Sequence, residues 1–223
     1  MTVNSSVWSD VERLIADFKI SPPKFENGVQ LERASDIPII PIEWLWPGWL
    51  ACGKLHILAG SPGTGKTTIA MSFASIVSTG GYFPCGAKCE QGSVLIWTGE
   101  DDPKDTLNPR LKALGADLTN IYFISSFIKG GESRSFDPAK DIDALKARAL
   151  ELGNVRLIIV DPIVSAVAGD GHKSNDVRRG LQPLVDLSMG INSALLGITH
   201  FTKGSAGSDP LDRVIGSQAF GAL

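Results

Sequence analysis

The sequence predicts an α/β fold in which helices cover both faces of a mostly parallel sheet. From residue 54 onward, short apolar runs alternate with helical stretches. Repeated strand–helix–strand units of this kind build parallel sheets with helices on both faces. The run Leu157–Val160 is apolar without interruption, which is typical of a strand buried on both faces of such a sheet.

Length and composition predict one sizeable domain. The chain has 223 residues, of which 43% are hydrophobic and 20% charged, so it can bury a normal core and is not disordered as a whole. Its 21 Lys and Arg against 24 Asp and Glu give a net charge of −3, which excludes a general basic coat but not a local basic groove. No apolar run approaches the roughly 20 residues needed to span a bilayer, and Met1–Ser9 lacks the features of a secretory signal. We therefore expect a cytoplasmic protein with no membrane partner.

The first 40 residues are predicted to be a separate N-terminal region, consisting of a helix and a Pro-rich arm, before a domain over 41–223. Apolar residues recur at helical spacing over 5–19. The segment 22–50 is expected to be extended, because its prolines cannot continue a helix. Trp44, Trp46 and Trp49 in this segment either pack on the same domain, meet a neighbouring subunit, or line the pocket for a nucleotide base.

The domain itself is expected to contain five strands and four helices in alternation. The strands are predicted at Leu55–Ala59, Ser93–Thr98, Ile121–Ile124, Arg156–Val160 and Ser193–Thr199. The helices are predicted at Gly65–Thr79, 103–115, Pro138–Leu152 and Asn175–Ser188. The polar, Gly-rich segment 125–137 is predicted to be a loop.

A phosphate-binding loop is the strongest functional signal. The stretch Gly60-Ser-Pro-Gly-Thr-Gly65-Lys66-Thr67 fits G-x-x-x-x-G-K-[ST], and it follows a predicted strand and opens a predicted helix. Glycines let the loop turn its backbone N–H groups toward phosphate oxygens, and the helix adds its positive N-terminal end. Lys66 is expected on the β- and γ-phosphates of ATP, and Thr67 on Mg²⁺. The predicted nucleotide-binding residues are Gly60, Ser61, Pro62, Gly63, Thr64, Gly65, Lys66, Thr67 and Thr68.

Acidic residues follow two of the predicted strands. Asp161 ends the buried run at 156–160, at the edge where open α/β sheets bind ligands, and is predicted to hold Mg²⁺. After Thr98 comes Gly-Glu-Asp-Asp-Pro. Glu100 is predicted to be the catalytic base for the attacking water, with Asp101 as its rival, whereas Asp102 is expected to cap the following helix.

His200 follows the last predicted strand, where a polar side chain can contact the γ-phosphate and report its hydrolysis. The alternative is that His200 is a structural hydrogen-bonding residue. Three cysteines, Cys52, Cys85 and Cys89, do not suit a disulfide framework. Cys85 and Cys89 could form half of a zinc site, but no second pair at ligand spacing follows, so we favour ordinary residues in a turn.

The order of these motifs resembles the RepA-like AAA-type ATPases, a RecA-fold group related to the DnaB-type hexameric replicative helicases and common on plasmids and phages. The resemblance covers about residues 40–222. It rests on WLWPGWLACGKLHILAGSPGTGKTT, GEDDPKDTLNPRLKALG, RLIIVDP, THFTKG and DRVIGSQAFGA. It implies a RecA-like P-loop domain and a homo-oligomer, by resemblance a hexamer. It also implies Glu100 as catalytic base, Asp161 as the Mg²⁺-side acid and His200 as the γ-phosphate sensor.

The same resemblance implies where single-stranded DNA would bind. The loops around 169–176 and 203–212 would face the centre of a ring, with Lys173, Arg178, Arg179, Lys203 and Arg213 as their cations. Arg213, Gly216 and Ser217 would lead into the next strand. Family members usually continue for further strands that carry an Arg or Lys finger for the neighbour's site. We therefore expect a domain that is incomplete at its C-terminal end, and a chain that by itself binds ATP but hydrolyses it slowly.

Three functions fit these motifs. The first is an ATP-hydrolysing motor subunit, similar to a replicative helicase, acting on single-stranded DNA. The second is a nucleotide-dependent assembly or switch module that acts on a protein partner without binding DNA. The third, a small-molecule kinase, fits less well, because kinases need an Arg-rich lid and Arg134 is the one arginine between residues 120 and 140.

Overall fold

The computed structural model describes residues 29, 31–167, 174–201, 207 and 213–214. The helix predicted over 5–19 lies outside these residues. The chain divides into two compact units between Pro41 and Ile42, and the first contains a short 3-10 turn, η1 (Ala34–Asp36). The division of the sequence at residue 40 into two domains stays a prediction. No helix in the described part of the chain is long and apolar enough to cross a membrane.

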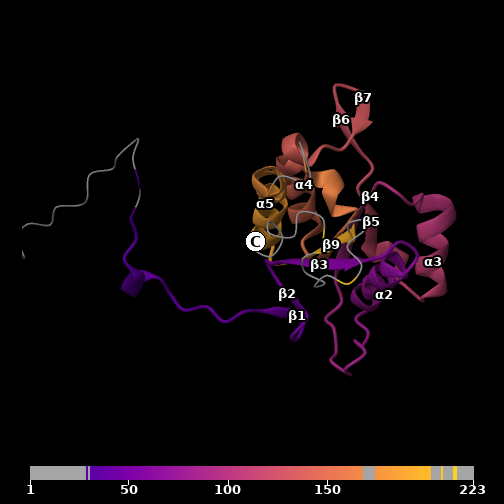
Figure 1. The fold of residues 1–223 in the computed structure, drawn as a ribbon, viewed down its shortest axis with the longest axis horizontal. Coiled ribbons are helices and arrows are strands. Elements are labelled where there is room, and N and C mark those ends of the chain that lie inside the picture. Colours follow the sequence, from indigo (N-terminus) through magenta and orange to yellow (C-terminus); the bar gives the residue numbers. More distant parts are fainter. Residues whose placement is uncertain (1–28, 30, 168–173, 202–206, 208–212, 215–223) are drawn as a thin grey trace, which may run out of the picture. The chain divides into compact units, whose positions relative to one another are not determined.

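A five-stranded parallel sheet forms the centre of the second unit (Figure 1). Its strand order is β3-β9-β8-β4-β5, which confirms the predicted α/β fold. The bounds are β3 (Leu55–Gly60), β4 (Ser93–Thr98), β5 (Ile121–Phe123), β8 (Val155–Asp161) and β9 (Ala194–His200). Since all five strands are parallel, the residues that follow β3, β4, β8 and β9 gather at one edge of the sheet.

Helices cover both faces of this sheet (Figure 1). In β8, Leu157 and Ile159 belong to one apolar cluster with residues of α2 (Lys66–Thr79) and α3 (Asn108–Ala113). Ile158 and Val160 belong to the other cluster, with residues of α4 (Pro138–Leu152) and α5 (Ser174–Gly190). Successive side chains of a strand point to opposite faces, so this uninterrupted apolar strand fills two cores.

The helix predicted over 103–115 begins with a π-helical turn. This turn is η2 (Pro103–Leu107), and α3 follows it directly. As predicted, Asp102 caps the turn: its carboxylate accepts hydrogen bonds from the backbone N–H groups of Lys104 and Asp105. π-turns are rare and occur mostly at functional sites. Two further 3-10 turns, η3 (Leu118–Asn120) and η4 (Ile163–Ala166), connect other elements.

The prediction of a loop over 125–137 is wrong, because most of this segment forms an antiparallel hairpin that projects from the sheet (Figure 1). The strands are β6 (Ser126–Lys129) and β7 (Glu132–Ser135). Gly130 and Gly131 between them both have positive φ, at 61° and 86°, as tight hairpin turns require. All four residues of β7 are exposed, so the hairpin lacks the apolar alternation that would have predicted its strands.

A second small hairpin, β1 (Trp44–Trp46) with β2 (Leu50–Ala51), precedes the sheet within the segment predicted to be extended. Trp46 is buried and stacks on Phe83, with 4.8 Å between ring centroids, and on Trp49 at 5.3 Å. Trp44 and Trp49 are 42% and 66% exposed. Trp46 therefore packs on its own domain, and none of the three tryptophans lines the hollow at the phosphate loop.

Candidate active site

The phosphate loop lies between β3 and α2, as predicted. Gly65 adopts a φ of 84°, in the left-handed region that favours glycine, and Lys66 is the first residue of α2. The Lys66 ammonium is buried and donates to the carbonyl oxygens of Gly60 and Ser61, each at 3.0 Å. Thr64 donates its hydroxyl to the Ser61 carbonyl at 2.8 Å. The loop is thus closed around the amine that is expected to contact phosphate.

A hollow of about 490 Å³ opens at this loop. Six of the nine predicted nucleotide-binding residues line it; Gly60, Ser61 and Thr64 instead shape the loop through the bonds just given. Asp161, Glu100 and His200, predicted from three other strand ends, line the same hollow. The full lining consists of Pro62, Gly63, Gly65, Lys66, Thr67, Thr68, Glu100, Asp101, Arg110, Asp161, Ile198 and His200.

Thr67 and Asp161 are in direct contact in this hollow. The Thr67 hydroxyl donates to Oδ2 of Asp161 at 2.7 Å. Asp161 is the last residue of β8 and is 7% exposed. Burial raises the pKa of this carboxyl, and the hydrogen bond from Thr67 partly opposes that effect. A hydroxyl and a buried carboxylate are hard oxygen ligands of the kind that Mg²⁺ prefers, so this donor pair fits the expected ion.

His200 lies between the loop lysine and the acidic turn. Its Nδ1 is 3.1 Å from Nζ of Lys66, and its Nε2 is 3.6 Å from Oε2 of Glu100. Glu100 stands two residues beyond Thr98, which is in register with Asp161 on the neighbouring strand. The side chain of Glu100 is half exposed. The predicted base and the predicted sensor are therefore neighbours at one side of the hollow.

Two residues in the lining were not predicted from the sequence. Ile198 belongs to β9, and Arg110 belongs to α3. An Nη1 atom of Arg110 is 3.2 Å from Oδ2 of Asp101, the rival candidate for the catalytic base. Helical spacing places Arg110 three residues after Leu107, at the flank of the buried leucines, but it does not show that this flank faces the hollow.

A further hollow, of about 520 Å³, adjoins the acidic turn. It shares Glu100 and Asp101 with the first hollow and is otherwise lined by the ends of β4 and β5 and the base of the hairpin, including Trp97, Phe123 and Phe136. The rings of Trp97 and Phe136 pack edge to face, with centroids 5.6 Å apart. The residue that follows β7 is thus packed on β4, the strand that leads to Glu100.

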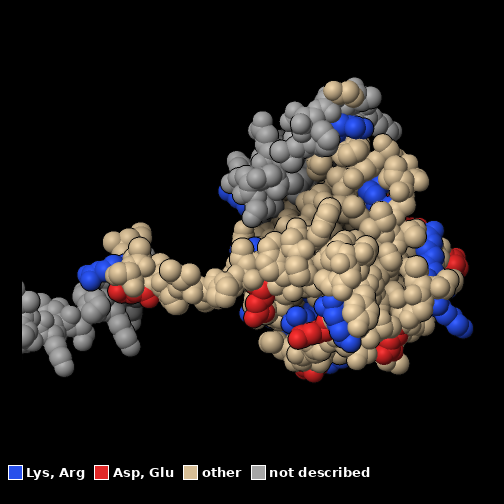
Figure 2. Space-filling view, turned by 90° about the horizontal axis from the view of Figure 1, so that it is seen from below, with Lys and Arg blue, Asp and Glu red and all other residues tan. Residues whose placement is uncertain are grey.

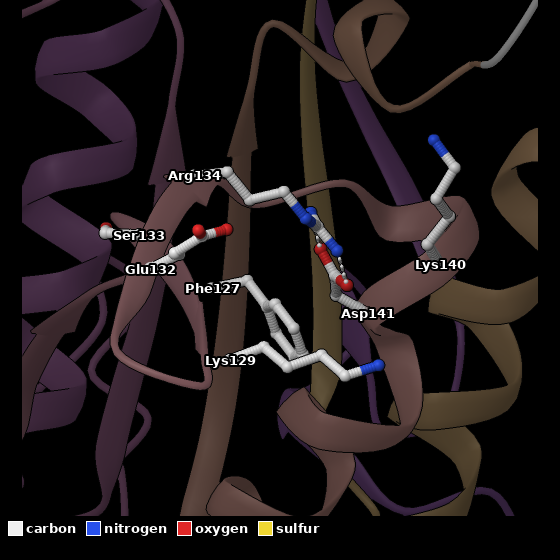
Figure 3. A pocket seen from close by; sticks show the side chains of 7 residues that line it. All are labelled: Phe127, Lys129, Glu132, Ser133, Arg134, Lys140 and Asp141. Carbon is white, nitrogen blue, oxygen red and sulfur yellow. Dashed lines mark hydrogen bonds and ion pairs between the residues drawn. The ribbon is translucent and has the colours of Figure 1, made fainter.

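A third hollow, of about 530 Å³, lies between the hairpin and α4 (Figure 3). Arg134 makes two hydrogen bonds to the buried carboxylate of Asp141, at 2.6 and 2.5 Å, and its guanidinium lies 4.6 Å from the centroid of the Phe127 ring. None of the residues predicted to bind nucleotide lines this hollow. Its central interaction joins the hairpin to α4.

The residues predicted to contact DNA are only partly described. Lys173, Lys203 and the side chain of Arg178 lie outside the described part, as do Gly216 and Ser217, which were predicted to lead into the next strand. Arg179 is exposed on α5. The guanidinium of Arg213 lies 4.2 Å from the centroid of the Phe201 ring, and Phe201 pairs with Val214 in an isolated β-bridge. Arg213 and Val214 therefore contact Phe201, the residue that directly follows His200.

The two cysteines that were considered as half of a zinc site make other contacts. The Cys85 sulfur accepts a hydrogen bond from the Trp46 indole at 3.1 Å. Cys89 is buried, and burial raises the pKa of its thiol to about 11. Within the described residues, no group of three or more His, Cys, Asp or Glu side chains is arranged to hold a metal ion.

Comparison with known proteins agrees with the geometry. The sequence profile described as "AAA domain" matches residues 21–206. No curated protein matches the chain. The matched region is more than half of the sequence and contains the phosphate loop, Glu100, Asp161 and His200. The fold is a RecA-like P-loop fold, and the chain belongs to the AAA domain family of nucleotide-binding P-loop ATPases.

Proposed function

We propose that this chain hydrolyses ATP with Mg²⁺, and that it does so as a motor subunit similar to a plasmid or phage replicative helicase, acting on single-stranded DNA. The observation that carries the first part is the contact of Thr67 with Asp161 beside the buried ammonium of Lys66. Hydroxyl, carboxylate and ammonium come from two separated segments and converge where a phosphate loop would seat a triphosphate.

The substrate would be held by the loop. Backbone N–H groups of the loop and the first turn of α2 would bind the phosphate oxygens, and Lys66 would move from the two loop carbonyls to the β- and γ-phosphates. Thr67 and Asp161 would hold Mg²⁺, which when bound neutralises charge on the phosphate oxygens.

Hydrolysis needs a group that accepts a proton from the attacking water. In the proposed step, the water oxygen bonds to the γ-phosphorus, the bond from that phosphorus to the bridging oxygen of ADP breaks, and the carboxylate of Glu100 takes the proton. His200, between Glu100 and Lys66, would contact the γ-phosphate. When this phosphate leaves, His200 would lose that contact, and Phe201 would transmit the change to Val214 and Arg213.

The proposed DNA contacts are on the loops around 169–176 and 203–212, in a homo-oligomer that would be hexameric by resemblance. Among the described residues on the face drawn in Figure 2, basic and acidic side chains are interspersed and form no continuous basic track. This arrangement, with the net charge of −3, also supports the second candidate, a nucleotide-dependent switch that acts on a protein partner without binding DNA.

One set of measurements separates the two candidates. Mg²⁺-dependent ATPase activity is measured with and without single-stranded oligonucleotide over a series of salt concentrations, and the oligomeric state is measured with and without ATP. A motor on DNA predicts stimulation by single strands that weakens steeply as salt rises. Activity that no nucleic acid changes at low salt, combined with an ATP-dependent change in assembly, would favour the switch.

A further inference from the structure

The turn that carries the proposed catalytic base begins from a fixed position in the sheet. Thr98 is the last residue of β4, and Gly99, Glu100 and Asp101 follow it. The Gly99 N–H donates to the carbonyl oxygen of Asp161 at 2.8 Å. This bond continues the pairing of β4 with β8, in which Thr98 is in register with Asp161. The main chain just before Glu100 is therefore held by the neighbouring strand.

The side chain of Thr98 holds the other end of the turn. Its hydroxyl donates to the carbonyl oxygen of Asp101 at 3.1 Å and accepts a hydrogen bond from the Asp101 N–H across 3.3 Å. A hydroxyl can do both, because it has one donor hydrogen and two acceptor lone pairs. One oxygen atom thus bonds both main-chain polar groups of the residue after Glu100. The base is enclosed between two main-chain positions that are each held by hydrogen bonds.

The Glu100 carboxylate itself has little to hold it. Its side chain is half exposed. In the described part of the chain, its one attractive polar contact is with His200, whose Nε2 is 3.6 Å from Oε2. This distance is longer than that of a hydrogen bond. The location of the carboxylate therefore depends on the main chain of the turn, and so on the hydrogen bonds that hold the turn.

Thr98 is separated from the nucleotide although it is bonded to the turn. It lines the second hollow but not the hollow at the phosphate loop, whereas Glu100 lines both. A general base has to be within hydrogen-bond reach of the water that it activates, and a misplacement of about 1 Å can lower a rate about 10²-fold. Loss of the Thr98 hydroxyl should therefore affect the hydrolysis step and not the binding of ATP.

We propose that Thr98 is a positioning residue for hydrolysis: its hydroxyl fixes the main chain on the far side of Glu100 and so keeps the carboxylate within reach of the attacking water. This inference rests on the proposed function, in which Glu100 is the catalytic base. Thr98 contacts neither the nucleotide nor the water, and it takes no part in the proton transfer. Its effect passes through the main chain of Asp101 to Glu100.

Two measurements on the full chain test this role: kcat for Mg²⁺-dependent ATP hydrolysis, and the affinity for a non-hydrolysable ATP analogue by calorimetry. Thr98→Val keeps the shape of the side chain without its hydroxyl, and should lower kcat about 10- to 100-fold while the affinity changes less than about 3-fold. Thr98→Ser retains the hydroxyl and should recover most of kcat. Thr98→Ala, which is smaller than threonine and cannot clash, should reproduce the selective fall if the valine variant does not fold.

The matched control is Thr106→Val. Thr106 is half-buried like Thr98, and its hydroxyl donates to Oδ1 of Asp105 at 2.8 Å. It lines neither of the two hollows that contain Glu100. Thr106→Val should therefore leave kcat and the affinity for the analogue close to those of the parent.

A double-mutant cycle with Glu100→Gln separates positioning of the base from a general structural effect. If Thr98 acts through Glu100, Thr98→Val should lower the residual rate of Glu100→Gln protein less than about 2-fold, since the two changes remove the same contribution. An equal fall in both backgrounds, a parental kcat in Thr98→Val and Thr98→Ala, or a loss of affinity that matches the fall in kcat would overturn the proposal. Absence of Mg²⁺-dependent hydrolysis by the parent, or undiminished hydrolysis by Glu100→Gln, would instead overturn the proposed function, and this inference with it.

Discussion

Thr67 donates its hydroxyl hydrogen to Asp161 across 2.7 Å, and so joins the first turn of α2 to the end of β8. Asp161 is nearly fully buried, and burial disfavours its charged form. Carboxylates whose pKa is shifted by burial cluster at functional sites. The contact brings together two segments that the sequence separates by 94 residues.

The Thr67 hydroxyl is expected to be needed for the metal rather than for the nucleotide. Thr67→Ala should weaken binding of ATP with Mg²⁺ about 10- to 100-fold, the usual effect of losing a hydrogen bond or ligand to a charged group. Binding measured in EDTA should change little. Thr67→Ser retains the hydroxyl and should behave like the parent. An equal loss with and without Mg²⁺ would contradict the metal role.

Glu100→Gln is expected to separate binding from turnover. Because the amide cannot take a proton from water, kcat should fall about 10²- to 10⁴-fold, the range for a general base, while ATP affinity is retained. Lys66→Ala should abolish nucleotide affinity itself. Steady-state hydrolysis and calorimetry distinguish the two variants. Undiminished hydrolysis by Glu100→Gln would move the base to Asp101 or to another residue.

Asp141 should make the stability of the protein depend on acidity. The hydrogen bonds from Arg134 hold the pKa of this carboxyl below its ordinary value, helped by the backbone N–H of Asp137 and the charge of Lys140. Its stabilising effect is therefore complete above about pH 4, and it is lost as the pH falls through the folded-state pKa. Asp141→Asn should lower the urea midpoint at pH 7 more than at pH 3.

The matched control for this prediction is Asp143→Asn, which alters an exposed carboxylate on the same helix. It should leave the difference between the two pH values close to that of the parent. If Asp141→Asn lowers the urea midpoint by the same amount at both pH values, the ion pair with Arg134 is not the source of the effect.

Gly197 in β9 is expected to tolerate no side chain. An added Cβ would lie 2.8 Å from Cγ1 and 2.9 Å from Cβ of Ile163 in η4. Overpacking of this kind costs about 1–3 kcal/mol, so Gly197→Ala should lower the free energy of unfolding by that amount in urea titrations. In an Ile163→Ala background, which lacks Cγ1 and Cδ1, Gly197→Ala should cost less than it does in the parent. A stabilised Gly197→Ala protein would show that alanine's strand preference outweighs the close contact.

Local patterns in the sequence were sufficient to predict the strands and helices whose apolar residues follow one strong period. Ser93–Thr98 and Pro138–Leu152 have the predicted bounds, because apolar runs and helical spacing are short-range signals. The hairpin from Ser126 to Ser135 was missed for the opposite reason. Its strands are polar. The Arg134–Asp141 pair joins the hairpin to α4, and the contact of Phe127 with Arg134 joins its two strands.

The sequence by itself determined the phosphate loop, since its glycines, Lys66 and Thr67 are consecutive and their geometry is local. It also placed Glu100, Asp161 and His200 at strand ends, which a parallel sheet brings to one edge. Only the tertiary structure decided which atoms meet: the order of the strands puts His200 between Lys66 and Glu100, and the packing of Leu107 and Leu111 turns Arg110 toward the hollow. Such contacts join residues far apart in the chain, and their distances depend on how whole elements pack.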